Sequence, residues 1–348
     1  MNVKAYRAQL FSWSKESKVE IVELISAGIG MAGPVLFATF LGYPALGFAA
    51  SVGSLAVSSV KVGSSFINHG EKLASALISV ALAAIAASLS FGQGYLTFGV
   101  LILLVILATL IGGYSRSLAV GTTRFVIFLI IILNMLNQTD YPMALIFSIL
   151  AGAIWTVSIS LVLGIWVHRC FKSSLDGAMQ GPTSKKIILW WDSLAHLSSW
   201  QFPIRLALCL VIAEGLRILW PEHHFYWIAI TVAILIQRKI ELFPIKTTQR
   251  VLGTIIGVIV ASLLLATSLP IWGLVISIGL FAGVRPLLKV RNYLVYSATM
   301  IPLIILIMEA GKPFQFTILF DRVFATLIGA VIVIAVNLIF SRTMAKSL

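Results

Sequence analysis

Long runs of apolar residues, separated by short polar segments, constrain this chain more than any other feature of its sequence. Of its 348 residues, 59% are hydrophobic and only 11% are charged, less than half the charged fraction of about 25% in an ordinary soluble domain. The mean hydropathy is +1.03. A single crossing of the bilayer takes about 20 mostly apolar residues. The composition therefore excludes a soluble globule, a disordered chain and a disulfide scaffold, and it allows many membrane crossings.

Twelve apolar runs are predicted to span the membrane. Lipid offers the backbone no hydrogen bonds, so each span has to be a helix or part of a closed barrel, and continuous rather than alternating apolar runs favour helices. The runs of the first half are Ile21–Leu41, Tyr43–Val60, Leu73–Phe91, Leu96–Tyr114, Phe125–Leu136 and Pro142–Val167. Those of the second half are Phe202–Leu219, Phe225–Ile236, Val251–Leu269, Ile271–Val284, Tyr293–Met308 and Phe316–Phe340. We expect an all-α integral membrane protein built from two six-helix halves.

The distribution of basic residues predicts the orientation of these spans. The formal net charge is +13, and the cytoplasmic loops of membrane proteins collect lysine and arginine. If the N-terminus is cytoplasmic and there are twelve crossings, only Arg217, Lys312 and Arg322 among the 25 basic residues fall on the outer side. The basic excess is thus explained by topology, and no nucleic-acid partner is expected. Both termini are predicted to be cytoplasmic.

The expected organisation has four parts. A polar cytoplasmic segment (1–20) is followed by the first membrane half (21–168), a cytoplasmic linker (169–201) and the second membrane half (202–348). Apolar residues recur at helical spacing late in the linker, at Ile187, Trp190, Trp191, Leu194 and Leu197. This pattern predicts an amphipathic helix on the cytoplasmic face of the membrane, with a helix packed against the loops as the alternative.

One motif is repeated within the second half. Arg250–Gly257 recurs three spans later as Arg322–Gly329, with Arg, Val, Thr, Ile and Gly at the same offsets. Three spans are an odd number, so the two copies enter the membrane from opposite sides, as in the inverted repeats of secondary transporters. A degenerate version begins at Lys72 and Leu145 in the first half. We therefore expect inverted three-helix repeats in each half.

The second half resembles a known family. The similar residues are His224-Phe225-Tyr226-Trp227-x-x-x-Thr231, then Gln237, then Arg250-Val251-Leu252-Gly253-Thr254-x-x-Gly257. This pattern is similar to that of the FUSC family, the fusaric acid resistance and aromatic acid exporter proteins, and it covers about residues 203–340. The membrane fold of plant aluminium-activated malate channels is also similar. The chain resembles a short form, without the large cytoplasmic domain that many members carry.

The resemblance implies export of aromatic carboxylic acids across a bacterial inner membrane. It also implies a periplasmic adaptor protein of the membrane-fusion type as a partner. A passive organic-anion channel and a non-transport membrane subunit of an adaptor-linked complex stay open as alternatives, and a homo-oligomer stays open as the assembly.

Polar residues inside apolar helices are costly and mark candidate sites. Arg250 and Arg322 are candidate substrate-binding residues, because guanidinium offers planar bidentate donors to a carboxylate. For Arg250 the alternative is an anchor at the membrane interface. Thr254 and Thr326 offer hydroxyls to the same anion, or serve close helix packing.

An aromatic residue and several acids complete the candidate site. Trp227 is expected either to stack on an aromatic substrate or to belong to the interfacial aromatic belt, and Thr231 and Gln237 follow it as hydrogen-bonding candidates. Glu214, Glu309 and Asp321 are the candidates for coupling transport to the proton motive force. Glu214 also lies three residues before Arg217, a spacing that favours a helical ion pair.

Several kinds of chemistry are not indicated. The sequence contains no nucleophile–base arrangement, phosphate-binding loop or nicotinamide fingerprint, so no enzyme activity and no cofactor are expected. His223 and His224 lack a third ligand, which argues against a metal site. Cys170 and Cys209 are expected to be free thiols.

Overall fold

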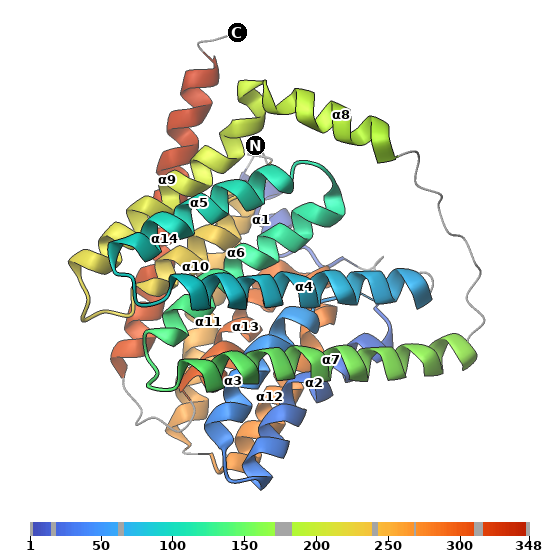
Figure 1. Ribbon diagram of the computed structural model, residues 1–348. Coiled ribbons are helices and arrows are strands. Elements are labelled where there is room, and N and C mark those ends of the chain that lie inside the picture. Colours follow the sequence, from blue (N-terminus) through green and yellow to red (C-terminus); the bar gives the residue numbers. More distant parts are fainter. Residues whose placement is uncertain are drawn as a thin grey trace. The chain divides into compact units, whose positions relative to one another are not determined.

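The computed structural model describes residues 3–14, 19–61, 66–170, 183–238, 243–267, 269–309 and 316–345. All regular elements within these ranges are helices (Figure 1). They are α1 (Val3–Leu10), α2 (Ile21–Phe40), α3 (Pro44–Val57), α4 (Phe66–Ser90), α5 (Tyr95–Ile111), α6 (Arg116–Leu136), α7 (Pro142–Cys170), α8 (Thr183–Leu194), α9 (Leu197–Leu219), α10 (Tyr226–Leu235), α11 (Phe243–Ala266), α12 (Ile271–Arg291), α13 (Tyr293–Glu309) and α14 (Phe316–Ala345). The prediction of an all-α protein is confirmed.

Each predicted apolar run lies largely within one helix, in α2–α7 and α9–α14. In the described part of the chain, seven helices are long and apolar enough to cross a membrane: α2, α4, α6, α7, α11, α12 and α14. The apolar helices α3, α5, α10 and α13 are shorter. The protein is therefore a multi-pass membrane protein by length and composition, and the number of twelve crossings stays a prediction.

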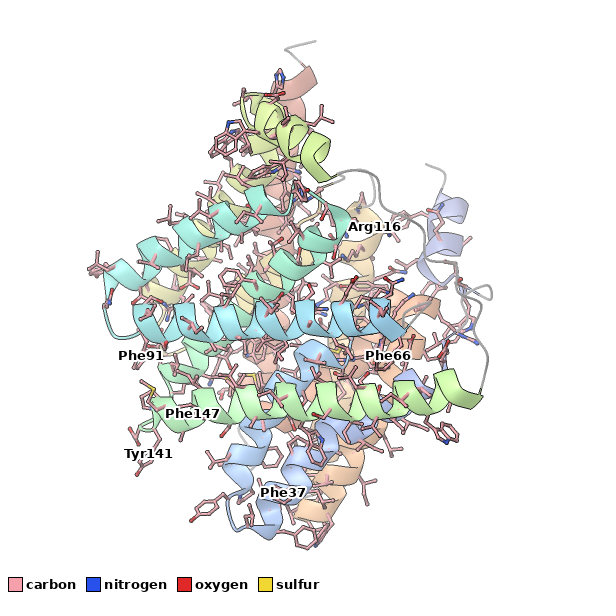
Figure 2. All side chains as sticks on the ribbon, turned by 45° about the vertical axis from the view of Figure 1, so that its right-hand side comes forward. Phe37, Phe66, Phe91, Arg116, Tyr141 and Phe147 are labelled. Atoms are coloured by element: carbon pink, nitrogen blue, oxygen red, sulfur yellow. The ribbon has the colours of Figure 1, made fainter. Side chains whose placement is uncertain are left out.

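Large apolar side chains cover the outer surfaces of these helices. Phe37 on α2 is 62% exposed and Phe147 on α7 is 69% exposed, and both are marked in Figure 2. In water, a surface with many such side chains promotes association or aggregation. In a bilayer the same side chains contact lipid tails, which agrees with the composition.

The linker helix differs from its prediction in one respect. The apolar spacing predicted one helix through Leu197, but α8 ends at Leu194 and α9 begins at Leu197, five residues before the expected span. A turn separates the two helices here, and in it the N–H of His196 donates to the carbonyl of Ser193 at 3.1 Å. In α8 the side chains of Ile188, Leu189 and Trp191 are exposed, and the indole of Trp190 donates to the carbonyl of Leu110 at 3.2 Å.

The helices pack into two compact units, and each unit takes helices from both halves of the sequence. Unit 1 comprises Met1–Ala81, Thr139–Ala178 and Thr248–Phe316. Unit 2 comprises Leu82–Gln138, Met179–Thr247 and Thr317–Leu348. The units describe packing rather than repeats, so the division of the sequence into two halves stays a prediction.

Unit 1 is built around α2, α3, α7, α12 and α13. Helix α2 packs against α3, α7 and α12, and α3 packs against α7 and α13. Close approach depends on glycine: a Cβ on Gly53 of α3 would collide with the carbonyl oxygen of Ile149 on α7. The Ser54 hydroxyl donates to the carbonyl of Gly152 at 2.9 Å. Small residues thus let the helix backbones touch, as is usual inside membranes.

Unit 2 is built around α5, α6, α9 and α10. Helix α9 packs against α5, α8 and α10, while α6 packs against α5 and α10. Part of this set of pairs has counterparts in unit 1, whereas the contacts of α7 with α2 and α3 have none in unit 2. The first helices of two predicted repeats pair in each unit (α2 with α12, α5 with α9), and so do the second helices (α3 with α13, α6 with α10). The predicted three-helix repeats would produce such matching pairs.

Candidate functional site

The candidate site residues are divided between the two units. Arg250 and Thr254 lie in unit 1. The others whose side chains are described lie in unit 2: Trp227, Thr231, Gln237, Arg322, Thr326, Glu214 and Asp321. The side chain of Glu309, at the end of α13, lies outside the described residues. Each unit is considered by itself.

In unit 1, glycines bring the motif helix α11 close to α13. A Cβ on Gly253 would lie 2.6 Å from the Cβ of Ser297, and one on Gly257 would lie 2.7 Å from the carbonyl oxygen of Ala298. Both distances are too short for a side chain. The motif glycines therefore serve helix packing, which places the arginine of the same motif against α13.

Arg250 is buried, with 2% of its surface exposed. Its Nη1 donates to the hydroxyl of Ser297 at 3.4 Å, and the guanidinium interacts electrostatically with Tyr293. Both partners bear hydroxyl groups and neither is acidic. The Thr254 hydroxyl donates to the carbonyl of Arg250 at 2.8 Å, so it is used within its own helix. A buried guanidinium among neutral groups is suited to an anion.

Arg285 is a second buried arginine of unit 1, and the sequence analysis did not select it. Its Nη2 donates to the hydroxyl of Ser58 at 2.6 Å, and it interacts with Tyr296. The rings of Tyr296 and Tyr293 lie 5.7 Å apart, which connects Arg285 to the surroundings of Arg250. The predicted span ended at Val284, and this boundary assigned Arg285 to a cytoplasmic loop. Because α12 continues to Arg291, Arg285 is a helical residue.

In unit 2, Arg322 lies on the ring of Trp227. Arg322 is 1% exposed, and its guanidinium carbon lies 3.6 Å from the centroid of the Trp227 ring, a cation–π contact. The hydroxyl of Thr326 donates to the carbonyl of Arg322 at 2.9 Å, as that of Thr254 does to Arg250. The repeated motif thus has the same local geometry in both units.

Two polar groups of α10 lie unpaired in this region. In the described part of the chain, Trp227 Nε1 and Thr231 Oγ1 are buried without a hydrogen-bond partner. A Cβ on Gly329 of α14 would lie 3.0 Å from Cγ2 of Thr231. Buried polar groups are rarely left unpaired unless they serve a ligand or a water molecule. The structure therefore packs Trp227 against Arg322 and Thr231 against Gly329 of the same helix, with spare hydrogen-bonding capacity on α10.

The second helices of the two predicted repeats carry matching residues. Trp227 and Thr231 on α10 face the Arg322 helix, and Tyr293 and Ser297 on α13 face the Arg250 helix. Each pair consists of an aromatic residue followed four positions later by a hydroxyl residue. This spacing is visible in the sequence and would have identified Tyr293 and Ser297 as candidates.

Gln237 lies beyond the end of α10, half-buried. Its carbonyl accepts a hydrogen bond from Arg205 Nη2 at 3.3 Å. Arg205 itself is buried and donates to the Asn337 side chain at 2.7 Å, connecting α9 with α14. Gln237 therefore contributes its backbone to the contacts of Arg205, a second buried arginine, after Arg285, that the sequence analysis did not select.

The two described acids of unit 2 that are candidates for proton coupling already have partners. Glu214 accepts from Nε of Arg217 at 2.6 Å, which confirms the predicted ion pair. Asp321 contacts His223 Nδ1 at 3.0 Å and His224 Nδ1 at 2.8 Å, and it also accepts from the His224 backbone N–H at 3.0 Å. Asp321 thus tethers the loop before α10 to the helix that carries Arg322.

In the part of the chain that the structure describes, no group of three histidine, cysteine or acidic side chains could hold a metal ion. Cys209 is a free, buried thiol. The side chain of Cys170 lies outside the described residues.

Comparison with known proteins gives one match. Residues 206–336 match the model of a family described as fusaric acid resistance protein-like. The match begins within α9 and ends within α14, so it contains both copies of the arginine motif and the Trp227 helix. No curated protein and no solved structure matches the chain significantly. The predicted resemblance to this family is confirmed for the second half of the chain.

Proposed function

From the FUSC family membership that the match to residues 206–336 supports, we propose that this protein exports small organic anions, and aromatic carboxylic acids in particular. The family is one of membrane transporters. The exporter would work by alternating access, with inverted repeats moving around an anion site, in a bacterial inner membrane with both termini in the cytoplasm.

The observation that carries this proposal is the pair of buried motif arginines. Arg250 and Arg322 are 2% and 1% exposed within apolar helices. A buried guanidinium is expensive in a membrane and is usually functional. Arg250 has neutral hydroxyl partners and Arg322 lies on an aromatic ring. A carboxylate would satisfy either charge with bidentate hydrogen bonds, and Trp227 would stack on the substrate ring.

Proton coupling requires an acid that changes partner during transport. Glu214 and Asp321 are the described candidates, and each now contacts a basic residue. Glu309 remains a candidate on sequence alone. An exporter of this design would exchange the salt bridge of one acid for a proton in each cycle.

The test is transport into sealed proteoliposomes that contain the purified chain and carry an imposed pH gradient. Labelled hydroxybenzoate is expected to accumulate against its concentration gradient, and a protonophore is expected to abolish the accumulation. Arg322→Ala is expected to remove transport while the protein still inserts.

The outcomes separate the alternatives. Arginine-dependent flux that runs only downhill would indicate a passive anion channel and would refute proton coupling. Flux that is the same with and without the protein would refute transport and favour a role in assembling an adaptor complex.

A further inference from the structure

Unit 2 contains a cavity that neither motif arginine lines. Its volume is about 440 Å³, which lies within the range of small-molecule sites, about 300–1,000 Å³. It is formed where the first turns of α5 meet the last turns of α6 and α9 and the start of α10. The residues of its wall that matter here are Tyr95, Phe98, Asn134, Glu214, Arg217 and Tyr226.

The charge presented to this cavity is positive, although the wall contains an ion pair. The side chain of Glu214 is only 7% exposed, whereas that of Arg217 is 37% exposed. The carboxylate therefore lies behind the guanidinium and binds it through Nε. A guanidinium has five N–H groups, so this bond leaves four on the two terminal nitrogens. Glu214 fixes the orientation of Arg217, and the two terminal nitrogens are the edge that binds a carboxylate in bidentate fashion.

Asn134 adds an unpaired donor to the same wall. It is 8% exposed, and within the described residues its Nδ2 atom has no hydrogen-bond partner. A buried amide without a partner is costly, and in a cavity wall it is satisfied when a ligand supplies an acceptor. Arg217 and Asn134 come from different helices, α9 and α6, and both residues line the cavity.

Most of the remaining side chains in the wall are aromatic or apolar, and Thr97 and Asn137 are the polar ones. Tyr95, Phe98 and Tyr226 contribute rings to it, together with Leu101, Ile130 and Leu133. Rings of this kind pack against an aromatic ligand by offset or edge-to-face stacking. A largely aromatic and aliphatic wall that also contains Arg217 and Asn134 fits a small molecule that combines a carboxylate with one ring.

We propose that this cavity is a binding site for a small aromatic carboxylate, with its carboxylate on Arg217 and Asn134 and its ring among Tyr95, Phe98 and Tyr226. The site is separate from the motif arginines, and binding to it requires no transport. Under the predicted topology, the four helix ends that form it lie on the outer side of the membrane, where an exporter releases its substrate.

The test measures binding to the full chain in detergent by equilibrium dialysis. The probes are labelled hydroxybenzoate and its neutral analogue hydroxybenzamide, and the variants are Arg217→Gln and Asn134→Leu. Each variant is expected to weaken hydroxybenzoate binding roughly tenfold, since each removes a hydrogen bond to a charged group. Hydroxybenzamide is expected to bind more weakly than hydroxybenzoate to the unchanged chain.

A control variant makes this result specific. Arg116→Gln removes the same charge from an exposed position at the opposite end of α6, marked in Figure 2, and is expected to bind like the unchanged chain. If Arg217→Gln fails to fold because Glu214 has lost its partner, Asn134→Leu carries the test, since it leaves the salt bridge intact.

Either of two results would overturn the proposal. They are wild-type affinity in Asn134→Leu and equal affinity for the acid and the amide. Because these measurements need no gradient, transport can fail in liposomes while binding holds, and the two proposals are tested separately.

Discussion

The surroundings of the two motif arginines differ, although the motif itself is the same in both units. Both arginines are buried, and each accepts a threonine hydroxyl on its backbone carbonyl. Arg250 contacts the hydroxyl residues Ser297 and Tyr293. Arg322 lies on the indole of Trp227. The motif helix thus carries the charged residue, and the helix packed against it carries the residues that contact this charge.

Under the proposed function, this difference implies separate roles for the two motif arginines. A guanidinium among hydroxyl groups favours a ligand that has a carboxylate, and it places few other requirements on that ligand. A guanidinium stacked on indole lies beside an extended aromatic surface, which favours a ligand that also has a ring. We therefore expect unit 1 to contribute charge recognition and unit 2 to contribute selectivity for aromatic acids.

Removal of either charge should have the largest effect. Arg250→Met and Arg322→Met keep most of the side-chain volume but remove the donors, so each should lower hydroxybenzoate flux on the order of 100-fold. The measurement is initial flux in proteoliposomes, with Arg116→Met as the exposed control. Wild-type flux in either variant would show that this arginine does not contribute to transport. It would also show that the two motifs are not functionally equivalent.

Alanine at the motif glycines should affect the two units unequally. A Cβ at Gly257 would meet the Ala298 carbonyl oxygen and the Ile301 side chain at 2.7 Å, whereas one at Gly329 would meet only the Thr231 side chain near 3 Å and a carbonyl at 3.4 Å. Overpacking costs about 1–3 kcal/mol. Gly257→Ala should lie at the upper end of that range and Gly329→Ala at the lower end. Thermal unfolding in detergent checks this, and equal midpoints would contradict it.

Lysine in place of arginine should lower transport to different extents in the two units. An ammonium group can still donate to Ser297 and Tyr293, so Arg250→Lys should keep part of the flux. Lysine cannot stack its charge on Trp227 as a planar guanidinium does, so Arg322→Lys should lose about tenfold more flux than Arg250→Lys. Equal loss in both variants would mean that the Trp227 contact does not contribute to transport.

The helices were predictable because lipid forces apolar segments to be helical. Every predicted run falls in a helix, and most boundaries agree within a few residues. The larger errors have a common cause. Helices α4, α6 and α11 begin at Phe66, Arg116 and Phe243 rather than at Leu73, Phe125 and Val251, and α12 ends at Arg291 rather than Val284. A helix continues through its polar ends where its backbone hydrogen bonds are still satisfied. The bounds of an apolar run do not show how far the helix extends beyond that run.

The site was predictable in its charges but not in its contacts. Arg250, Arg322 and Trp227 are conspicuous because polar and aromatic residues stand out in apolar sequence. The stacking of Arg322 on Trp227 and the pairing of Asp321 with His223 and His224 depend on which helices pack together. That packing mixes the two halves of the sequence within each unit. Asn134 was missed because a lone asparagine in an apolar run gives no sign of the cavity beside it.

The smallest expected effect concerns the two matched hydroxyl residues. Ser297 contacts Arg250 through two long hydrogen bonds, accepting from Nη1 at 3.4 Å and donating to the Arg250 carbonyl at 3.5 Å, so Ser297→Ala should lower stability by about 0.5–1 kcal/mol. Thr231 is buried without a partner for its hydroxyl among the described residues, so Thr231→Val should leave stability unchanged or slightly raised, because an unpaired polar group is removed. If that hydroxyl serves a substrate near Arg322, flux should nevertheless fall in Thr231→Val. Thermal unfolding and flux on the same preparations test this, and a variant that is both less stable and fully active would show that Thr231 serves packing alone.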